Sequence, residues 1–227
     1  MLFAPGSDER KLRRALESDA DAVVADLEDA VLAGEKAAAR GTVERVLGPA
    51  TTGPARLVRI NGLATPHFDD DLALLARLRL DAVVLPKATP AAAAAVAAVG
   101  LPVLAIVETA TGVRLSYELA ASPGVFALLL GTVDLGVELG LETRVDGSEL
   151  QYLRSRLVVD SAAAGIRAPF DGVRLALRDP EGLAQDASLA RSLGMRGKAC
   201  IHPEQVAVVN RTFAPRAEEV DLSLIHI

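Results

Sequence analysis

Residues 81–108 read DAVVLPKATPAAAAAVAAVGLPVLAIVE, and this stretch decides the fold. It holds two apolar runs, Ala82–Leu85 and Val103–Val107, separated by an alanine-rich segment in which Thr89 and Pro90 are typical of a helix start. Neither run alternates with polar residues, which is the pattern of parallel strands covered by helices. The stretch therefore predicts one strand–helix–strand unit of a parallel sheet.

The same unit recurs along the whole chain. Eight apolar runs are each followed by a polar break; they are Leu2–Pro5, Ala22–Leu27, Leu57–Asn61, Ala82–Leu85, Val103–Val107, Val125–Leu130, Gly172–Ala176 and Lys198–Ile201. Amphipathic segments lie between them, and a last helix is expected from Pro203 to near Pro215. Because eight units alternate and no glycine-rich nucleotide-binding motif follows a strand, we predict an α/β fold of the (β/α)₈ barrel type.

The predicted barrel fills residues 1–215 as one domain, since no linker or low-complexity segment interrupts them. Residues 216–227 form a short tail that ends in the apolar sequence SLIHI. We expect this tail to be truncated or disordered, or to dock elsewhere.

The composition argues against several classes of function. The net charge is −6 and aromatic residues make up 3% of the chain, so no nucleic-acid partner is expected. The longest apolar run, around residues 91–101, is too short to span a membrane. The single cysteine, Cys200, excludes an internal disulfide, and residues 1–11 show no secretory signal. We expect a cytoplasmic protein with no membrane partner.

Charged and polar side chains stand where the predicted strands end, which is the catalytic face of a barrel. They are Asp26, Glu28, Asp29, Arg59, Asn61, Lys87, Glu108, Asp134 and His202. Strand alternation places Asp26 and Glu28 on one face and sends Asp29 to the other. The three acids could be catalytic, or could merely balance Arg59 and Lys87.

Glu108 and Asp134 form the most informative pair. Two carboxylates at the ends of neighbouring apolar strands repel each other unless a positive charge lies between them. Mg²⁺ satisfies such a pair, and Gly131 and Gly136 on either side of Asp134 let backbone approach a ligand. From position alone, an arginine–carboxylate network that ties the strand ends together is the favoured explanation.

Other residues have simpler interpretations. Lys87 could form a Schiff base, but a salt bridge or phosphate contact at the rim is favoured. His202 before Pro203 is expected to make a hydrogen bond at a strand end rather than to assist a cysteine nucleophile. His67 is expected in a loop or at a helix start.

Seven motifs occur in a fixed order: LFAPGSDERK, DLEDAV, LVRIN, VVLPKA, AIVETATGV, GTVDLG and GKACIHPEQVAVVN. Together they resemble the citrate lyase beta-subunit-like group of the HpcH/HpaI aldolase superfamily, which includes malyl-CoA lyases and related CoA-ester lyases. The resemblance covers residues 2 to about 215 and implies the same barrel.

The resemblance also implies roles for single residues. Glu108 and Asp134 look like Mg²⁺ ligands, with Glu108 also lining the substrate site. Arg59 looks like a catalytic clamp for the substrate's carboxylate and carbonyl. Lys87, Gly131 and Thr132 are expected on the substrate-binding rim.

The reaction implied is Mg²⁺-dependent cleavage of a hydroxyacyl thioester, of citryl or malyl type, to an acyl thioester and an α-keto acid such as oxaloacetate or glyoxylate. The thioester would be carried by CoA or an acyl-carrier protein, and a homo-oligomer (trimer or hexamer) is expected. The alternatives are a class II pyruvate-type aldolase that needs no thioester, and a catalytically impaired paralogue that works as a binding or assembly subunit.

The chain departs from many relatives after Pro215. Their further helices pack on a neighbouring subunit and, in malyl-CoA lyase-like members, supply a catalytic acid. The sequence after Pro215 has nothing comparable, so no residue is assigned as the acid or base.

Overall fold

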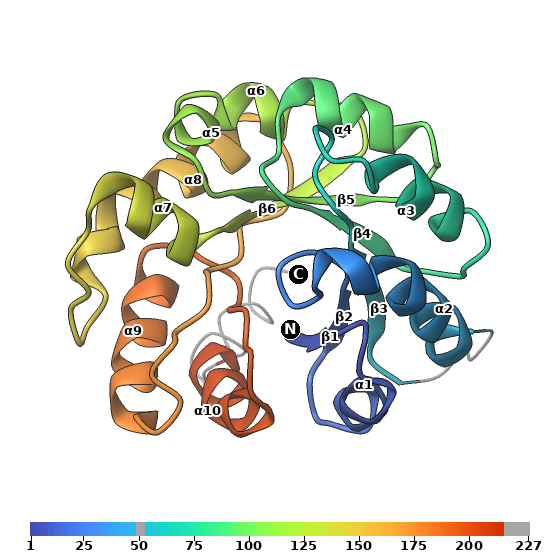
Figure 1. Ribbon diagram of the computed structural model, residues 1–227. Helices are drawn as coiled ribbons and strands as arrows, with labels where there is room; N and C mark the ends of the chain where they lie inside the picture. Colours follow the sequence, from blue (N-terminus) through green and yellow to red (C-terminus); the bar gives the residue numbers. More distant parts are fainter. Residues whose placement is uncertain (49–52, 216–227) are drawn as a thin grey trace, which may run out of the picture.

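A computed structural model describes residues 1–48 and 53–215, and the predicted tail of residues 216–227 lies outside them. Six parallel strands pair in chain order. They are β1 (Leu2–Pro5), β2 (Ala22–Asp26), β3 (Ala55–Arg59), β4 (Ala82–Leu85), β5 (Val103–Val107) and β6 (Val125–Leu130). Figure 1 shows these strands surrounded by the helices.

Two short segments close the sheet into a barrel. Phe170 bridges Leu129 of β6, Asp171 bridges Lys198, and Cys200 bridges Leu2 of β1, all in parallel. Backbone hydrogen bonds follow the same path, from Leu130 N to Phe170 O at 3.0 Å and from Phe3 N to Cys200 O at 2.8 Å. The predicted (β/α)₈ barrel is therefore confirmed, with bridging segments in place of the last two strands.

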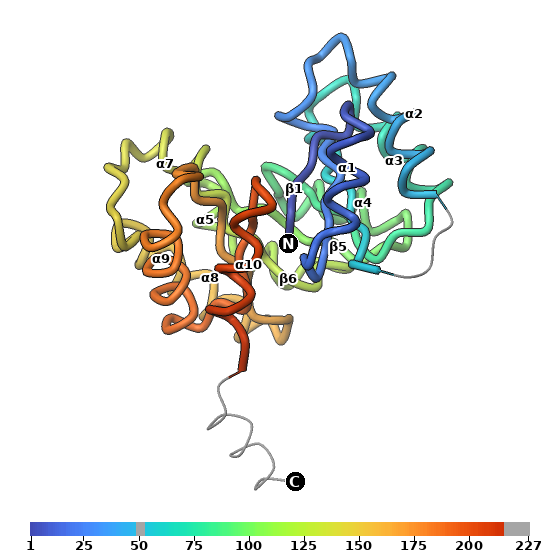
Figure 2. The backbone as a smooth tube through the Cα atoms, turned by 90° about the horizontal axis from the view of Figure 1, so that it is seen from below, coloured from blue at the N-terminus to red at the C-terminus, as the bar shows by residue number. Residues whose placement is uncertain are grey.

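Ten α-helices are described, and most of them follow a strand. They are α1 (Glu9–Leu16), α2 (Lys36–Leu47), α3 (Phe68–Leu75), α4 (Pro90–Ala97), α5 (Ala110–Arg114), α6 (Ser116–Ala120), α7 (Thr132–Leu139), α8 (Gln151–Ala163), α9 (Pro180–Ser192) and α10 (Pro203–Phe213). Two short 3₁₀ helices, Ala33–Glu35 and Ser148–Leu150, precede α2 and α8. Figure 2 shows α10 beside β1, so the end of the described chain meets its beginning.

Strand alternation divides the apolar residues into two cores. The larger core lies between the strands and the helices and includes Val23, Val83 and Leu128. The smaller core fills the barrel interior and includes Val24, Leu104 and Ala127. Among the described residues, no helix has the length and apolar character needed to cross a membrane.

The seventh strand is not where the apolar pattern placed it. Pairing occurs at Phe170 and Asp171, whereas the predicted segment Gly172–Ala176 forms no regular strand. Asp171 is fully buried, so the paired segment lacks the continuous apolar run that the sequence argument required. Similarly, the third strand ends at Arg59 rather than at Asn61, because Asn61 leaves the sheet and bonds to Asp71 of α3.

A buried ion network holds the two bridging segments in place. Arg154 of α8 donates two hydrogen bonds to Asp171 at 3.0 and 2.9 Å and also bonds to Asp186 of α9. Lys198 Nζ lies 2.5 Å from Asp171 Oδ2 and 2.7 Å from Asp186 Oδ2. Burial opposes ionisation of Asp186, but Lys198 and Arg154 outweigh it and hold its pKa below the ordinary value. Two cations and two anions thus neutralise one another inside the fold.

We expect Lys198→Met to lower the free energy of unfolding by about 3–5 kcal/mol, because two buried carboxylates would then share one arginine. Urea denaturation measures the change. Lys11→Met is the matched control, since the Lys11 side chain is 60% exposed and lies 3.6 Å from Asp8. Equal stability losses in the two variants would contradict a structural role for the network.

Candidate active site

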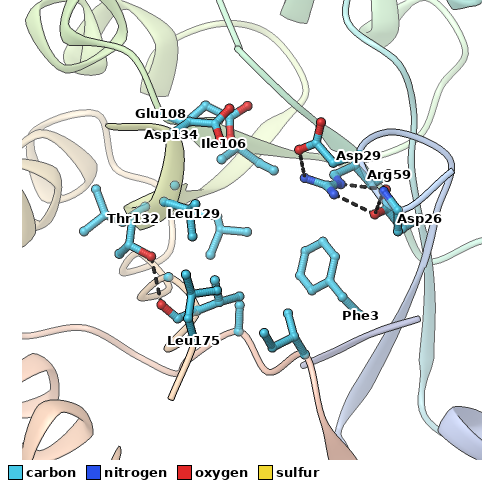
Figure 3. Close-up of a pocket in the computed structure, with 18 of the residues that line it drawn as sticks. Phe3, Asp26, Asp29, Arg59, Ile106, Glu108, Leu129, Thr132, Asp134 and Leu175 are labelled. Carbon is cyan, nitrogen blue, oxygen red and sulfur yellow. Dashed lines mark hydrogen bonds and ion pairs between the residues drawn. The ribbon is translucent and has the colours of Figure 1, made fainter. Parts of the chain in front are cut away.

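A cavity of about 390 Å³ opens at the C-terminal ends of the strands. Its lining has two parts: charged side chains at the rim and hydrocarbon side chains from the barrel interior. Figure 3 shows Glu108 and Asp134 on one side, Arg59 with Asp26 and Asp29 on another, and Phe3, Leu129 and Leu175 below them. Every charged residue that the sequence placed on the rim, with the exception of His202, comes together at this end of the barrel.

Arg59, the last residue of β3, is held by carboxylates. Its Nε and Nη2 donate to the two oxygens of Asp26 at 2.7 and 2.6 Å, and its Nη1 lies 2.9 Å from Glu28. The guanidinium also lies 5.4 Å from the centre of the Phe3 ring. Burial by itself would lower the pKa of Arg59, but Asp26 and its neighbours outweigh burial and raise it. Arg59 is therefore charged and firmly oriented.

The acids at the end of β2 and in the turn after it all lie on the same rim. Asp26 accepts backbone hydrogen bonds from Glu28 and Ala30 at 2.9 and 3.1 Å, which folds the chain into a turn. Asp29 consequently lines the cavity and lies 3.5 Å from Arg59 Nη1. The expectation that Asp29 points to the opposite face was wrong, because the strand and its alternation end at Asp26.

Glu28 forms ion pairs with both cations of the rim. Lys87 Nζ donates to Oε1 at 2.9 Å. Oε2 is buried and makes no well-formed hydrogen bond, despite its 2.9 Å separation from Arg59 Nη1. Burial raises the pKa of the Glu28 carboxyl.

Lys87 contributes through its backbone as well as its side chain. It has a φ of 44°, a left-handed conformation that no other non-glycine residue adopts in the described chain. This conformation directs its N–H to Glu108 Oε1 at 2.6 Å. Its ammonium lies between Glu28 and Asp134, 3.3 Å from Asp134 Oδ2. Lys87 thus links β2, β5 and α7, and the rim salt bridge favoured from the sequence is present.

Glu108 follows β5 and is 5% exposed. Burial raises the pKa of its carboxyl to about 7. Its side chain packs against Gly131, where an added Cβ would lie 2.2 Å from Glu108 Cβ. Glycine at position 131 therefore allows Glu108 to reach the cavity.

Asp134 lies in the first turn of α7 and not at a strand end. The sequence argument placed Asp134 after the sixth strand and identified no helix start there. Thr132, Val133 and Asp134 line the cavity, and their N–H groups make no hydrogen bond to the described residues. Such free N–H groups at a helix start bind anions well.

The rim carries an excess of negative charge. When all are ionised, five carboxylates (Asp26, Glu28, Asp29, Glu108 and Asp134) face two cations, Arg59 and Lys87. No cluster of three or more histidine, cysteine or acidic ligands exists in the described residues. Mg²⁺ is nevertheless commonly bound by only one or two protein carboxylates, with water and substrate oxygens as its other ligands. The charge excess fits an added cation.

His67, His202 and Cys200 lie apart from the charged residues of the rim. His202 is the N-cap residue before α10, where its Nδ1 accepts the Glu204 N–H at 3.3 Å, and His67 precedes α3. Cys200 is buried on the helix side of the barrel. None of them has a catalytic arrangement.

Two residues near the site were missed from the sequence. The buried Lys36 donates to the carbonyls of Leu27 and Glu28, both at 2.7 Å, and so fixes the turn after β2. Glu138 of α7 accepts the N–H of Ala110 at 3.0 Å and anchors α7 to the start of α5. No local pattern could identify either one, because each partner is known only from the fold.

Comparison with known proteins gives consistent matches. A family model described as HpcH/HpaI aldolase/citrate lyase matches residues 1–203. A (3S)-malyl-CoA thioesterase of Cereibacter sphaeroides is 38% identical over 98% of this chain and 79% of its own length. A citrate lyase beta subunit of M. tuberculosis complexed with oxaloacetate and magnesium has a TM-score of 0.84 and 33% identity, covering 94% of this chain and 96% of its own. Protein CitE of Mycobacterium tuberculosis, in complex with magnesium, acetoacetate and coenzyme A, has a TM-score of 0.85 and 32% identity. The match covers 99% of this chain and 84% of that protein's chain.

We expect Gly131→Ala to lower the free energy of unfolding by about 1–3 kcal/mol and to displace Glu108, because the new methyl group would overlap the Glu108 side chain. Urea denaturation and a crystal structure of the variant measure the two effects. Gly136→Ala is the control in the same motif, since nothing lies within 4 Å of an added Cβ there. If both variants are equally stable and Glu108 does not move, the proposed fit between residues 131 and 108 is wrong.

Proposed function

The chain belongs to the HpcH/HpaI aldolase/citrate lyase family, and on this premise we propose that it is a Mg²⁺-dependent carbon–carbon lyase. Its substrate would be a hydroxyacyl thioester of CoA or an acyl-carrier protein. The products would be a shorter acyl thioester and an α-keto acid. The citryl and malyl types are the starting candidates, because the matched relatives bear these names.

The observation that carries the proposal is that Glu108 and Asp134 share a rim on which carboxylates outnumber cations. Both carboxylates contact Lys87, which links them across β5 and α7. Burial already disfavours the charged form of Glu108. A divalent cation held by the two residues would relieve that penalty, and solved relatives bind magnesium.

The residues of this chain would divide the work as follows. The free N–H groups at the start of α7 would bind the keto acid's carboxylate. Arg59, oriented by Asp26, would face the oxygen on which negative charge develops during bond cleavage. Lys87 would hold Glu28 and Asp134 in place, and the apolar wall of the cavity would exclude water. When bound, Mg²⁺ would supply Lewis-acid polarisation of the keto acid's carbonyl group.

A second candidate is thioester hydrolysis, which the name of the 38% identical relative favours. Hydrolysis consumes water and releases the free thiol with the hydroxy acid intact. Cleavage of the carbon–carbon bond leaves the thioester intact on the acyl product and releases a keto acid. The two reactions therefore differ in every product.

We expect Glu108→Gln and Asp134→Asn each to lower kcat/KM for keto acid release at least about 100-fold, because each removes a metal ligand. Removal of divalent ions with EDTA should abolish turnover and added Mg²⁺ should restore it. The control is Asp69→Asn, an exposed acid in the first turn of α3. Unchanged turnover in the Glu108 variant would refute the metal assignment.

Product analysis with malyl-CoA and citryl-CoA should show keto acid and acyl-CoA in equal amounts, measured by mass spectrometry. Free CoA with intact hydroxy acid would instead indicate a thioesterase. Turnover of a hydroxy-keto acid without any thioester would indicate a class II aldolase. Ligand binding without any product would indicate a binding or assembly subunit.

A further inference from the structure

Cleavage of a carbon–carbon bond beside a thioester needs a group that moves a proton. The substrate hydroxyl must lose its proton as it becomes the carbonyl of the keto acid, and the thioester enolate must gain one to become the acyl product. The roles proposed above for the rim residues do not supply this group. One carboxylate that reaches the cavity and can exchange a proton is enough for both transfers.

The cavity offers few groups that can exchange a proton. Its ionisable lining residues, among those that the structure describes, are Asp26, Asp29, Arg59, Glu108 and Asp134. Glu108 and Asp134 are the residues proposed to hold Mg²⁺. Arg59 keeps its proton, because an arginine guanidinium stays charged in proteins. The candidates for proton transfer are therefore Asp26 and Asp29.

Asp26 is fully engaged by its neighbours and is only 2% exposed. Its Oδ1 accepts hydrogen bonds from Glu28 N at 2.9 Å and from Arg59 Nε at 2.7 Å. Its Oδ2 accepts from Ala30 N at 3.1 Å and from Arg59 Nη2 at 2.6 Å. A proton on either oxygen would have to replace one of these donors, so Asp26 orients Arg59 and is not free to exchange protons.

Asp29 has the freedom that Asp26 lacks. Its side chain is 60% exposed, and its contact with the described residues is the 3.5 Å approach of Oδ2 to Arg59 Nη1. The backbone on both sides is nevertheless fixed, because Glu28 N and Ala30 N are bonded to Asp26. Figure 3 shows the Asp29 carboxylate beside the Arg59 guanidinium at the cavity. Asp29 thus combines a fixed position with an available carboxylate, next to the cation proposed to face the reacting oxygen.

We propose that Asp29 is the acid–base catalyst of this reaction, an inference that rests on the proposed function. Its carboxylate accepts the proton of the substrate hydroxyl, and the electron pair of that O–H bond forms the C=O bond of the keto acid. The adjacent carbon–carbon bond breaks, and its electron pair passes to the thioester enolate. The protonated Asp29 then gives the proton to the enolate carbon, which completes the acyl thioester. Protons and electrons balance without a further reactant.

Asp29→Asn removes the proton acceptor and keeps the size of the side chain. With malyl-CoA and citryl-CoA as probes, kcat for keto acid release should fall at least about 100-fold while KM stays unchanged, because proton transfer acts in the transition state. Isothermal titration calorimetry with Mg²⁺ alone should still show binding, since Asp29 is not a proposed ligand. Asp69→Asn, at an exposed acid of α3, is the matched control and should keep the wild-type kcat.

Asp29→Ala separates proton transfer from a structural role. Because the side chain is largely exposed, formate can enter the space that it leaves and supply the missing carboxylate. Added formate should therefore raise the kcat of Asp29→Ala at least about tenfold. It should leave Asp29→Asn unchanged, where the amide fills the space, and Asp69→Ala unchanged, where the carboxylate has no catalytic part.

Three results would overturn the inference. Full activity of Asp29→Asn would mean that another group carries the proton, such as a residue of a neighbouring subunit, and would leave the proposed function standing. A loss of activity that formate does not reverse in Asp29→Ala would reduce Asp29 to a residue that positions Arg59. If the wild-type chain releases no keto acid from either thioester, the proposed function fails, and this inference fails with it.

Discussion

Barrel closure forces the strands to end at one rim, and the charge gathered there is the constraint on which the rest of the site depends. Asp26, Glu28, Asp29, Glu108 and Asp134 share that rim with only Arg59 and Lys87. Arg59 is consequently saturated by carboxylates, and the ammonium of Lys87 lies between two of them. Burial raises the pKa of Glu108, because the contacts with Lys87 do not fully offset the lost solvation of its carboxylate. Each of these features follows from negative charge that the protein itself does not neutralise.

The ion network around Lys198 provides an internal contrast. It is almost completely buried, and its two cations match its two carboxylates. It joins the bridging segments to α8 and α9, where the barrel has least apolar strand pairing, and it leaves no charge for a ligand. The rim network is unbalanced and faces a cavity. The charges that close the barrel are therefore buried and balanced, whereas the charges at the rim are unbalanced and face the cavity.

The two halves of the cavity would allow one site to bind a charged substrate and still exclude water. The rim and the start of α7 supply the charge and the free N–H groups, while Phe3, Ile106 and Leu129 supply a dry wall. We propose that a cation binds on the first side. Electrostatic interactions at the rim are stronger because the wall lowers the local dielectric.

The sequence by itself determined the alternation of strands and helices, the barrel, the family and the group of rim residues, because these follow from local periodicity and from motifs. Only the tertiary structure decided that pairing shifts to Asp171, since its charge is tolerated through distant partners in α8 and at Lys198. It also decided that Asp134 belongs to a helix, that Asp29 turns into the cavity, and that Lys36 fixes the turn after β2. These outcomes depend on contacts between residues far apart in the chain, which no local pattern encodes.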